Sequence, residues 1–208
     1  MPQIKKQAVA DAILRGASRL FRERGYSGTS MAEIARAADT STSNIYVYFL
    51  SKLDILFAIY QPWLDEHFLK LERDLEQISE PANRLEHILL TLWRDLPAAD
   101  NGFANNMMQA LSTACPNERY DPGLLQWMVK RVSALVRTAL PSEHAGLAED
   151  DDLAQILVMT FEGFSMNRQL PGTAPTIDPA VRLMVGLLLG DAASSGSRIQ
   201  PVQVTSIR

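Results

Sequence analysis

The chain has 208 residues, of which 47% are hydrophobic and 21% are charged; this suits one or two folded domains and excludes a disordered protein. No stretch approaches the roughly 18 consecutive apolar residues of a membrane span, and no apolar block follows the first basic residues. A single cysteine, Cys115, has no partner for an internal disulfide, and three scattered histidines do not suggest a zinc site. We therefore expect a cytoplasmic protein that needs no metal or cofactor.

Charge is distributed unevenly along the chain. Residues 1–60 hold eight Lys and Arg against five Asp and Glu, whereas the whole chain has a net charge of −4. A basic head on an acidic remainder suits a head that meets a polyanion, because neutralising phosphates contributes to affinity for any nucleic acid.

The spacing of apolar residues predicts helices along nearly the whole chain and no strand. Gly25 stands where the first helix would end in a C-terminal cap. Ser30 with Glu33 forms a capping-box pattern, which opens a helix over about 30–38, and Ser41 can cap another over about 42–48. The turn between them falls at Asp39 and Thr40.

A long helix follows from Ser51, which makes a second capping-box pattern with Asp54. Its apolar stripe runs from Leu53 to Ile78. Pro62 falls inside this stripe and predicts a kink or a break, because proline removes one helical hydrogen bond.

Five further helices are expected in the remainder, at about 83–96, 103–113, 122–140, 152–170 and 179–192. Asp178 and Pro179 are typical of the start of the last one. Residues 194–208 show no period and are predicted to be a flexible tail. The expected fold is all-α with about nine helices, divided into a three-helix domain at 1–50 and a larger domain at 51–193.

The two short helices match a helix-turn-helix. Ile34, Ala35, Ile45 and Phe49 hold its helices together, and the opposite side of the second helix carries short polar groups followed by aromatic ones. Such a surface suits a recognition helix, whose first residues contact base edges. A structural three-helix subdomain with a solvated polar face is the alternative at this point.

The stretch from Ile13 to Tyr60 resembles the DNA-binding domain of the TetR (tetracycline-repressor) family. The residues that carry the resemblance are Leu20-Phe21, Gly25-Tyr26, Thr29-Ser30-Met31, Ile34-Ala35, Ala38, Ser41, Ile45-Tyr46, Tyr48-Phe49 and Ser51-Lys52. Asp39 stands where the family usually has glycine, and it tolerates the left-handed conformation better than most residues do. The family often has a cation near the start of the recognition helix, whereas this chain has none between Arg36 and Lys52.

The resemblance implies roles for individual residues of the head. The expected base readers are Thr42, Ser43, Asn44 and Val47. The expected phosphate contacts are Thr29, Tyr46, Tyr48 and Lys52.

For the body, the resemblance implies a small-molecule effector site and a homodimer built from the last two helices. The residues expected at the dimer interface are Leu157, Phe164, Met184 and Leu188. A buried pair of core helices is the alternative. The residues expected around the effector are Trp63, Trp93, Phe103, Met107, Trp127, Met128 and Phe161, although a methionine or aromatic residue at helical spacing is more often plain core.

Polar selectivity in that site is expected from residues that face inward among Asn105, Asn106, Gln109, Glu162, Asn167 and Arg168. Cys115 is either a thiol sensor or an inert residue.

The function implied is a transcriptional repressor, which an apolar or aromatic effector releases from a palindromic double-stranded operator. The alternative is a helical DNA binder without an effector, nucleoid-associated or regulated by another protein. An enzyme is disfavoured, because the sequence shows no nucleophile-elbow, phosphate-loop or dinucleotide motif.

Overall fold

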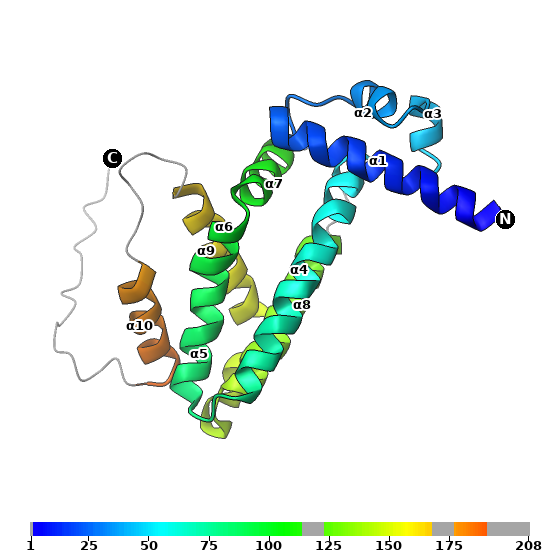
Figure 1. The fold of residues 1–208 in the computed structure, drawn as a ribbon. Helices are drawn as coiled ribbons and strands as arrows, with labels where there is room; N and C mark the ends of the chain where they lie inside the picture. The colour runs from blue at the N-terminus through cyan, green and yellow to red at the C-terminus, as the bar shows by residue number, and fades with distance from the viewer. Residues whose placement is uncertain (1, 114–122, 168–176, 191–208) are drawn as a thin grey trace, which may run out of the picture.

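Ten α-helices form the described part of the chain, residues 2–113, 123–167 and 177–190 of a computed structural model. Three of them, α1 (Pro2–Arg24), α2 (Met31–Ala37) and α3 (Thr42–Ile45), form a head at one end of a helical body (Figure 1). The body holds α4 (Lys52–Glu76), α5 (Pro81–Leu90), α6 (Leu96–Ala99), α7 (Asn101–Thr113), α8 (Gly123–Ala139), α9 (Asp152–Asn167) and α10 (Ile177–Leu188). The predicted all-α fold is confirmed.

The helix count exceeds the predicted nine because the element expected at 83–96 is divided. A π-helical turn at Thr91–Asp95 separates α5 from α6, and a 3₁₀ segment at Ser142–Ala148 precedes α9. The last helix begins at Ile177, two residues before the predicted start. Cys115, Arg168, the side chain of Asn167 and the predicted tail at 194–208 lie outside the described residues.

The caps predicted in the head are confirmed. The backbone N–H of Glu33 donates to the Ser30 hydroxyl, and the Glu33 carboxylate accepts from the Ser30 backbone N–H at 2.8 Å. That backbone hydrogen bond is the main reason why the pKa of Glu33 is lowered. Asp39 has φ +51°, so the turn that joins α2 to α3 does use the left-handed conformation.

Helix α4 joins the head to the body and runs without interruption through Pro62, so the predicted break is wrong. Residues on both sides of the proline, including Leu56 and Leu64, are fully buried. Their packing holds the two halves together even though the proline removes one backbone donor. Along its length α4 contacts α1 in the head, then α7, α8 and α5 in the body (Figure 1).

One hydrophobic core extends from the head through the body. Within it α9 packs between α7 and α8 and also contacts the π-helical turn, while α10 packs on α5. The indole N–H of Trp93, in the π-helical turn, donates to the backbone carbonyl of Leu157 at 3.1 Å and ties these two elements together. Over the described ranges, none of the helices combines the length and the apolar character that a membrane crossing requires.

Candidate functional site

Helix α3 and the residues directly after it present an exposed, mixed polar and aromatic surface. Ile45 is fully buried and anchors α3 on the head, whereas Tyr46 and Val47 are 50% and 69% exposed. Ser43 is exposed on the same short helix. Large exposed side chains on a rigidly anchored helix end are available to a partner, and this surface holds three of the predicted DNA contacts.

Two other predicted base readers, Thr42 and Asn44, are half-buried. The Asn44 side-chain amide donates to the Thr40 hydroxyl at 2.7 Å, and its backbone N–H donates to the Ser41 hydroxyl. Asn44 therefore stabilises the turn before α3, and only the remaining capacity of its side chain is available to a base.

The structure corrects the prediction for Thr29 and gives Lys52 a second role. The Thr29 hydroxyl donates to the Gly25 carbonyl, and the residue is only 2% exposed, so its side chain does not reach a phosphate. The Lys52 ammonium donates to the carbonyls of Tyr26 and Thr29 at 2.8 Å each, and it lies 4.0 Å from the centre of the Tyr26 ring. Both side chains hold the loop between α1 and α2 on α4.

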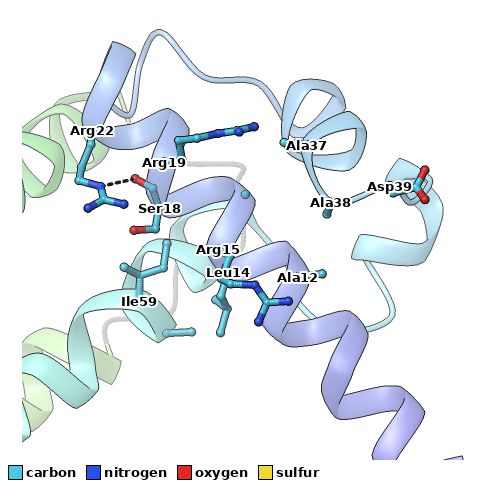
Figure 2. Close-up of a pocket in the computed structure, with 12 residues that line it drawn as sticks. Ala12, Leu14, Arg15, Ser18, Arg19, Arg22, Ala37, Ala38, Asp39 and Ile59 are labelled. Carbon is cyan, nitrogen blue, oxygen red and sulfur yellow. Dashed lines mark hydrogen bonds between the residues drawn. The ribbon is translucent and has the colours of Figure 1, made fainter.

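Positive charge on the head gathers along α1. Arg15, Arg19 and Arg22 are exposed beside an open groove of about 760 Å³, which Ala37 to Asp39 and Ile59 help to line (Figure 2). Arg22 donates to the Ser18 carbonyl. Among the described residues no carboxylate pairs with any of the three guanidinium groups. The spacing of these arginines in the sequence could have predicted that they share one side of a helix. They were counted there only toward the charge of residues 1–60.

A cavity of about 260 Å³ lies in the body between α7 and α9. Its described lining comes from Ala104, Met107, Met108, Leu111, Ser112, Phe161, Glu162 and Ser165. Met107 and Phe161 are two of the predicted effector residues. Glu162 is one of the predicted polar residues. Ala104, Leu111, Ser112 and Ser165 were missed because helical spacing predicts which residues share a face, but not which neighbouring helix leaves space beside it.

The cavity is mostly apolar but contains two polar groups that have no partner among the described residues. The Ser165 hydroxyl is buried and makes no hydrogen bond, and the residue is 4% exposed. Burial raises the pKa of Glu162, and no hydrogen bond or opposite charge counters that effect. A ligand with one polar end would satisfy both groups.

The other five predicted effector residues belong to the packing of the body instead. Trp93 and Met128 are 1% exposed, and the Trp93 indole is bonded to Leu157. Trp127 packs edge-to-face on Phe68. Trp63 and Phe103 belong with Tyr60 to an aromatic cluster beside α4, from which Phe103 reaches Phe161 at a ring distance of 6.2 Å. Each is of a residue type that is common in ligand pockets, but each lies on a helix face that another helix covers.

The helix that lines the cavity also contacts the head. On α7, the Gln109 side-chain carbonyl accepts from the backbone N–H of Ser27 at 2.9 Å, and its amide donates to Asn105. Gly25 has φ +72°, and a Cβ there would lie 2.7 Å from the Gln109 oxygen, so only glycine permits this approach. Asn106 points elsewhere and donates to the Tyr60 hydroxyl. Gln109 thus joins the cavity-lining helix to the loop that precedes α2.

Two of the four predicted interface residues are core residues in the single chain. Leu157 is fully buried and Leu188 is 6% exposed, whereas Phe164 and Met184 are half-buried. The neighbouring positions on the same helices are the exposed ones: Ile156 (53%), Met159 (61%), Leu183 (62%) and Leu187 (57%). In the single chain, Leu157 and Leu188 therefore lie on faces of these helices that pack inward.

Comparison with known proteins agrees with the geometry of the head. The family model described as bacterial regulatory proteins, tetR family, matches residues 13–59. The HTH-type transcriptional regulator HbdR of Aromatoleum sp. (strain CIB) is 41% identical over 75 residues, which are 36% of this chain and 33% of that protein. The matched region thus spans about a third of that relative's length.

Two solved structures resemble nearly the whole chain in fold. FadR from Bacillus subtilis, in complex with stearoyl-CoA, has a TM-score of 0.59 at 19% identity, covering 89% of this chain and 98% of that one. Thermus thermophilus FadR, in complex with lauroyl-CoA, has a TM-score of 0.58 at 20% identity, covering 93% and 99%. Residues 13–59 thus match the tetR family of bacterial regulatory proteins, and the chain as a whole has the fold of these two solved regulators.

Proposed function

We propose that this protein is a DNA-binding transcriptional regulator, and specifically a homodimeric repressor that a small effector releases from a palindromic operator. The head at 1–50 reads DNA, and the body at 51–193 binds the effector and dimerises. The observation that carries this proposal is the exposed surface of Ser43, Tyr46 and Val47 on a head of the TetR family. Side chains at such a helix end reach base edges in the major groove.

The dimer contact is proposed on the exposed apolar residues of α9 and α10, namely Ile156, Met159, Leu183 and Leu187. Apolar side chains that alternate with core residues on two helices suit a four-helix contact around a two-fold axis. Such a contact places two heads about 34–36 Å apart, or a multiple of it, so that they meet successive major grooves.

The effector site is proposed in the cavity between α7 and α9. The two FadR structures hold acyl-CoA molecules. An apolar acyl chain suits the apolar part of the lining, so an acyl thioester is the effector class that these relatives suggest. The cavity of about 260 Å³ is small for such a chain, and the described lining offers no cation to a phosphate. A more compact effector therefore fits this chain better.

We propose that effector binding is coupled to the head through α7. A ligand between α7 and α9 must shift one of these helices to gain space, and α7 is bonded to the head through Gln109 and Ser27. The two binding equilibria are thermodynamically linked. If the effector lowers the affinity of the protein for its operator, the operator lowers the affinity of the protein for the effector by the same factor.

The test is selection of the operator from random double-stranded DNA, followed by titration of the selected site. We expect a pseudo-palindrome, and we expect Val47→Ala to relax the preference at particular base pairs by about 1–3 kcal/mol without lowering protein stability. Leu147→Ala, a change at an exposed residue of the body, is the matched control. Selection of no defined sequence, or an unchanged preference in Val47→Ala, would contradict the proposed role of α3.

A further inference from the structure

The polar groups of the cavity between α7 and α9 define the charge of the ligand that it takes, provided that this cavity is the effector site as proposed above. Two of them, Glu162 and Ser165, stand one helical turn apart on α9 and both line the cavity. Residues three apart on a helix lie on the same side, so a single ligand group can meet both.

Among the described residues, neither group has a partner. The Ser165 hydroxyl is buried without a hydrogen bond, and no described residue forms an ion pair or hydrogen bond with the Glu162 carboxylate. Glu162 is half-buried, and even partial burial of a carboxylate without a counter-charge or a proton is costly, so this site favours an occupant that supplies one of them.

The remaining lining has the composition that suits an organic cation. The described lining residues include no lysine, arginine or histidine, so a carboxylate or phosphate on the ligand would meet Glu162 without compensation. Phe161 supplies an aromatic ring, and Met107, Met108 and Leu111 supply apolar and polarizable surface. An ammonium group is attracted both to a carboxylate and to the face of an aromatic ring.

We propose that the cavity binds a compact apolar amine in its protonated form, with Glu162 as counter-charge and the Ser165 hydroxyl as hydrogen-bond acceptor for the ammonium. The volume of about 260 Å³ is at the lower end of ligand pockets, so the apolar body is the size of one ring with a short chain. The acyl-CoA ligands of the FadR structures are anionic and do not match this arrangement.

The test compares three probes of equal shape and different charge: 2-phenylethylamine, 2-phenylethanol and phenylacetate. Affinity of each for the full chain is measured by calorimetry. We expect the amine to bind most tightly and phenylacetate most weakly. Glu162→Gln is expected to weaken the amine by about 10–100-fold and leave the alcohol nearly unchanged, because only the charged hydrogen bond is lost. Ser165→Ala should weaken the amine by a smaller factor.

The matched control is Glu149→Gln, which changes an exposed carboxylate outside the cavity lining and should leave all three affinities unchanged. Equal binding of amine and alcohol would overturn the proposal in favour of a protonated Glu162. Binding of lauroyl-CoA in place of the amine, or binding of none of the probes, would also overturn it. Operator binding without any probe is measured in parallel, so failure of the ligand class is distinguishable from failure of the regulator function. Amine binding that leaves the operator bound supports the ligand class and contradicts only the proposed release.

Discussion

Lys52 illustrates how a single side chain can have a structural role that the sequence does not reveal. A cation at the start of a helix after the recognition helix is well placed for a phosphate, and the resemblance to the TetR family implies that role. In the folded chain its ammonium bonds two carbonyls of the loop between α1 and α2 and lies over Tyr26. These contacts position the loop that carries Ser27 and therefore concern the stability of the head as well as any contact with DNA.

Replacing Lys52 by methionine should therefore lower the free energy of unfolding by about 1–3 kcal/mol, since charged hydrogen bonds to two half-buried carbonyls are lost while the aliphatic stem is kept. Urea unfolding of the purified chain measures this change. Lys70→Met, at an exposed position of the same helix, serves as control and should change stability little. Wild-type stability in Lys52→Met, together with weaker binding to all DNA sequences, would restore the purely phosphate-binding role.

Glu162 leads to a prediction about pH. Burial raises its pKa in the folded chain above the ordinary value of 4.5, so the folded state holds its proton more tightly than the unfolded state does. Stability contributed by the protonated form is complete below 4.5 and is lost as the pH rises through the folded pKa. Wild type should lose stability as the pH rises through this range, whereas Glu162→Gln has no proton to lose at this position. The free energy of unfolding of Glu162→Gln minus that of wild type should therefore rise with pH and then level off. A difference independent of pH would mean that the carboxylate is solvated.

At the scale of elements, α7 has two tasks on opposite sides. One side lines the cavity with Met107, Met108 and Leu111, and the other holds the loop before α2 through Gln109. The left-handed Gly25 makes this close approach possible. A ligand that displaces α7 would therefore act on the head through Gln109, in addition to any path along α4, which runs continuously through Pro62.

Gln109→Ala tests this connection. The Ser27 backbone N–H loses its acceptor, so its hydrogen exchange should become faster, and the antagonism between effector and operator should fall by several-fold. Exchange is followed by NMR or mass spectrometry, and operator affinity is titrated with and without 2-phenylethylamine. The control is Gln126→Ala, at an exposed position of α8. Full antagonism in Gln109→Ala would assign the coupling to α4 instead.

At the scale of the whole molecule, the exposed apolar residues of α9 and α10 are the feature that one chain alone does not explain. Four large apolar side chains, each more than half exposed, lie on two helices of the body. Isolated exposed apolar residues are ordinary, whereas several on two helices that also supply the core are typical of an interface.

The double variant Met159→Glu with Leu187→Glu should convert a dimer into a monomer that remains folded, because the new carboxylates are solvated in the single chain and buried only in the dimer. Sedimentation measures the mass, and circular dichroism measures the helix content. Operator affinity should fall in parallel. Leu69→Glu, on an exposed position of α4, is the control. A persistent dimer would place the interface elsewhere, whereas loss of helix content would mean that these residues belong to the core.

Structural features that depend on a few neighbouring residues can be predicted from the sequence. Capping by Ser30, Ser41 and Ser51, the left-handed turn at Asp39 and the succession of helices follow from side chains that hydrogen-bond to neighbouring backbone. The resemblance of Ile13 to Tyr60 to the TetR family rests on the same kind of local pattern, and it identified the head.

What only the tertiary structure decided is which face of each body helix is covered. Spacing along α9 groups Leu157 and Phe161 with one side and Ile156 and Met159 with another, but it does not state which neighbour packs on each. Packing of α9 on the π-helical turn and α8 buried Leu157, left Met159 exposed and opened the space beside Glu162. Which face is covered depends on contacts between residues far apart in the chain, so no local pattern predicts it. The proposed effector site was therefore the part least accessible to the sequence.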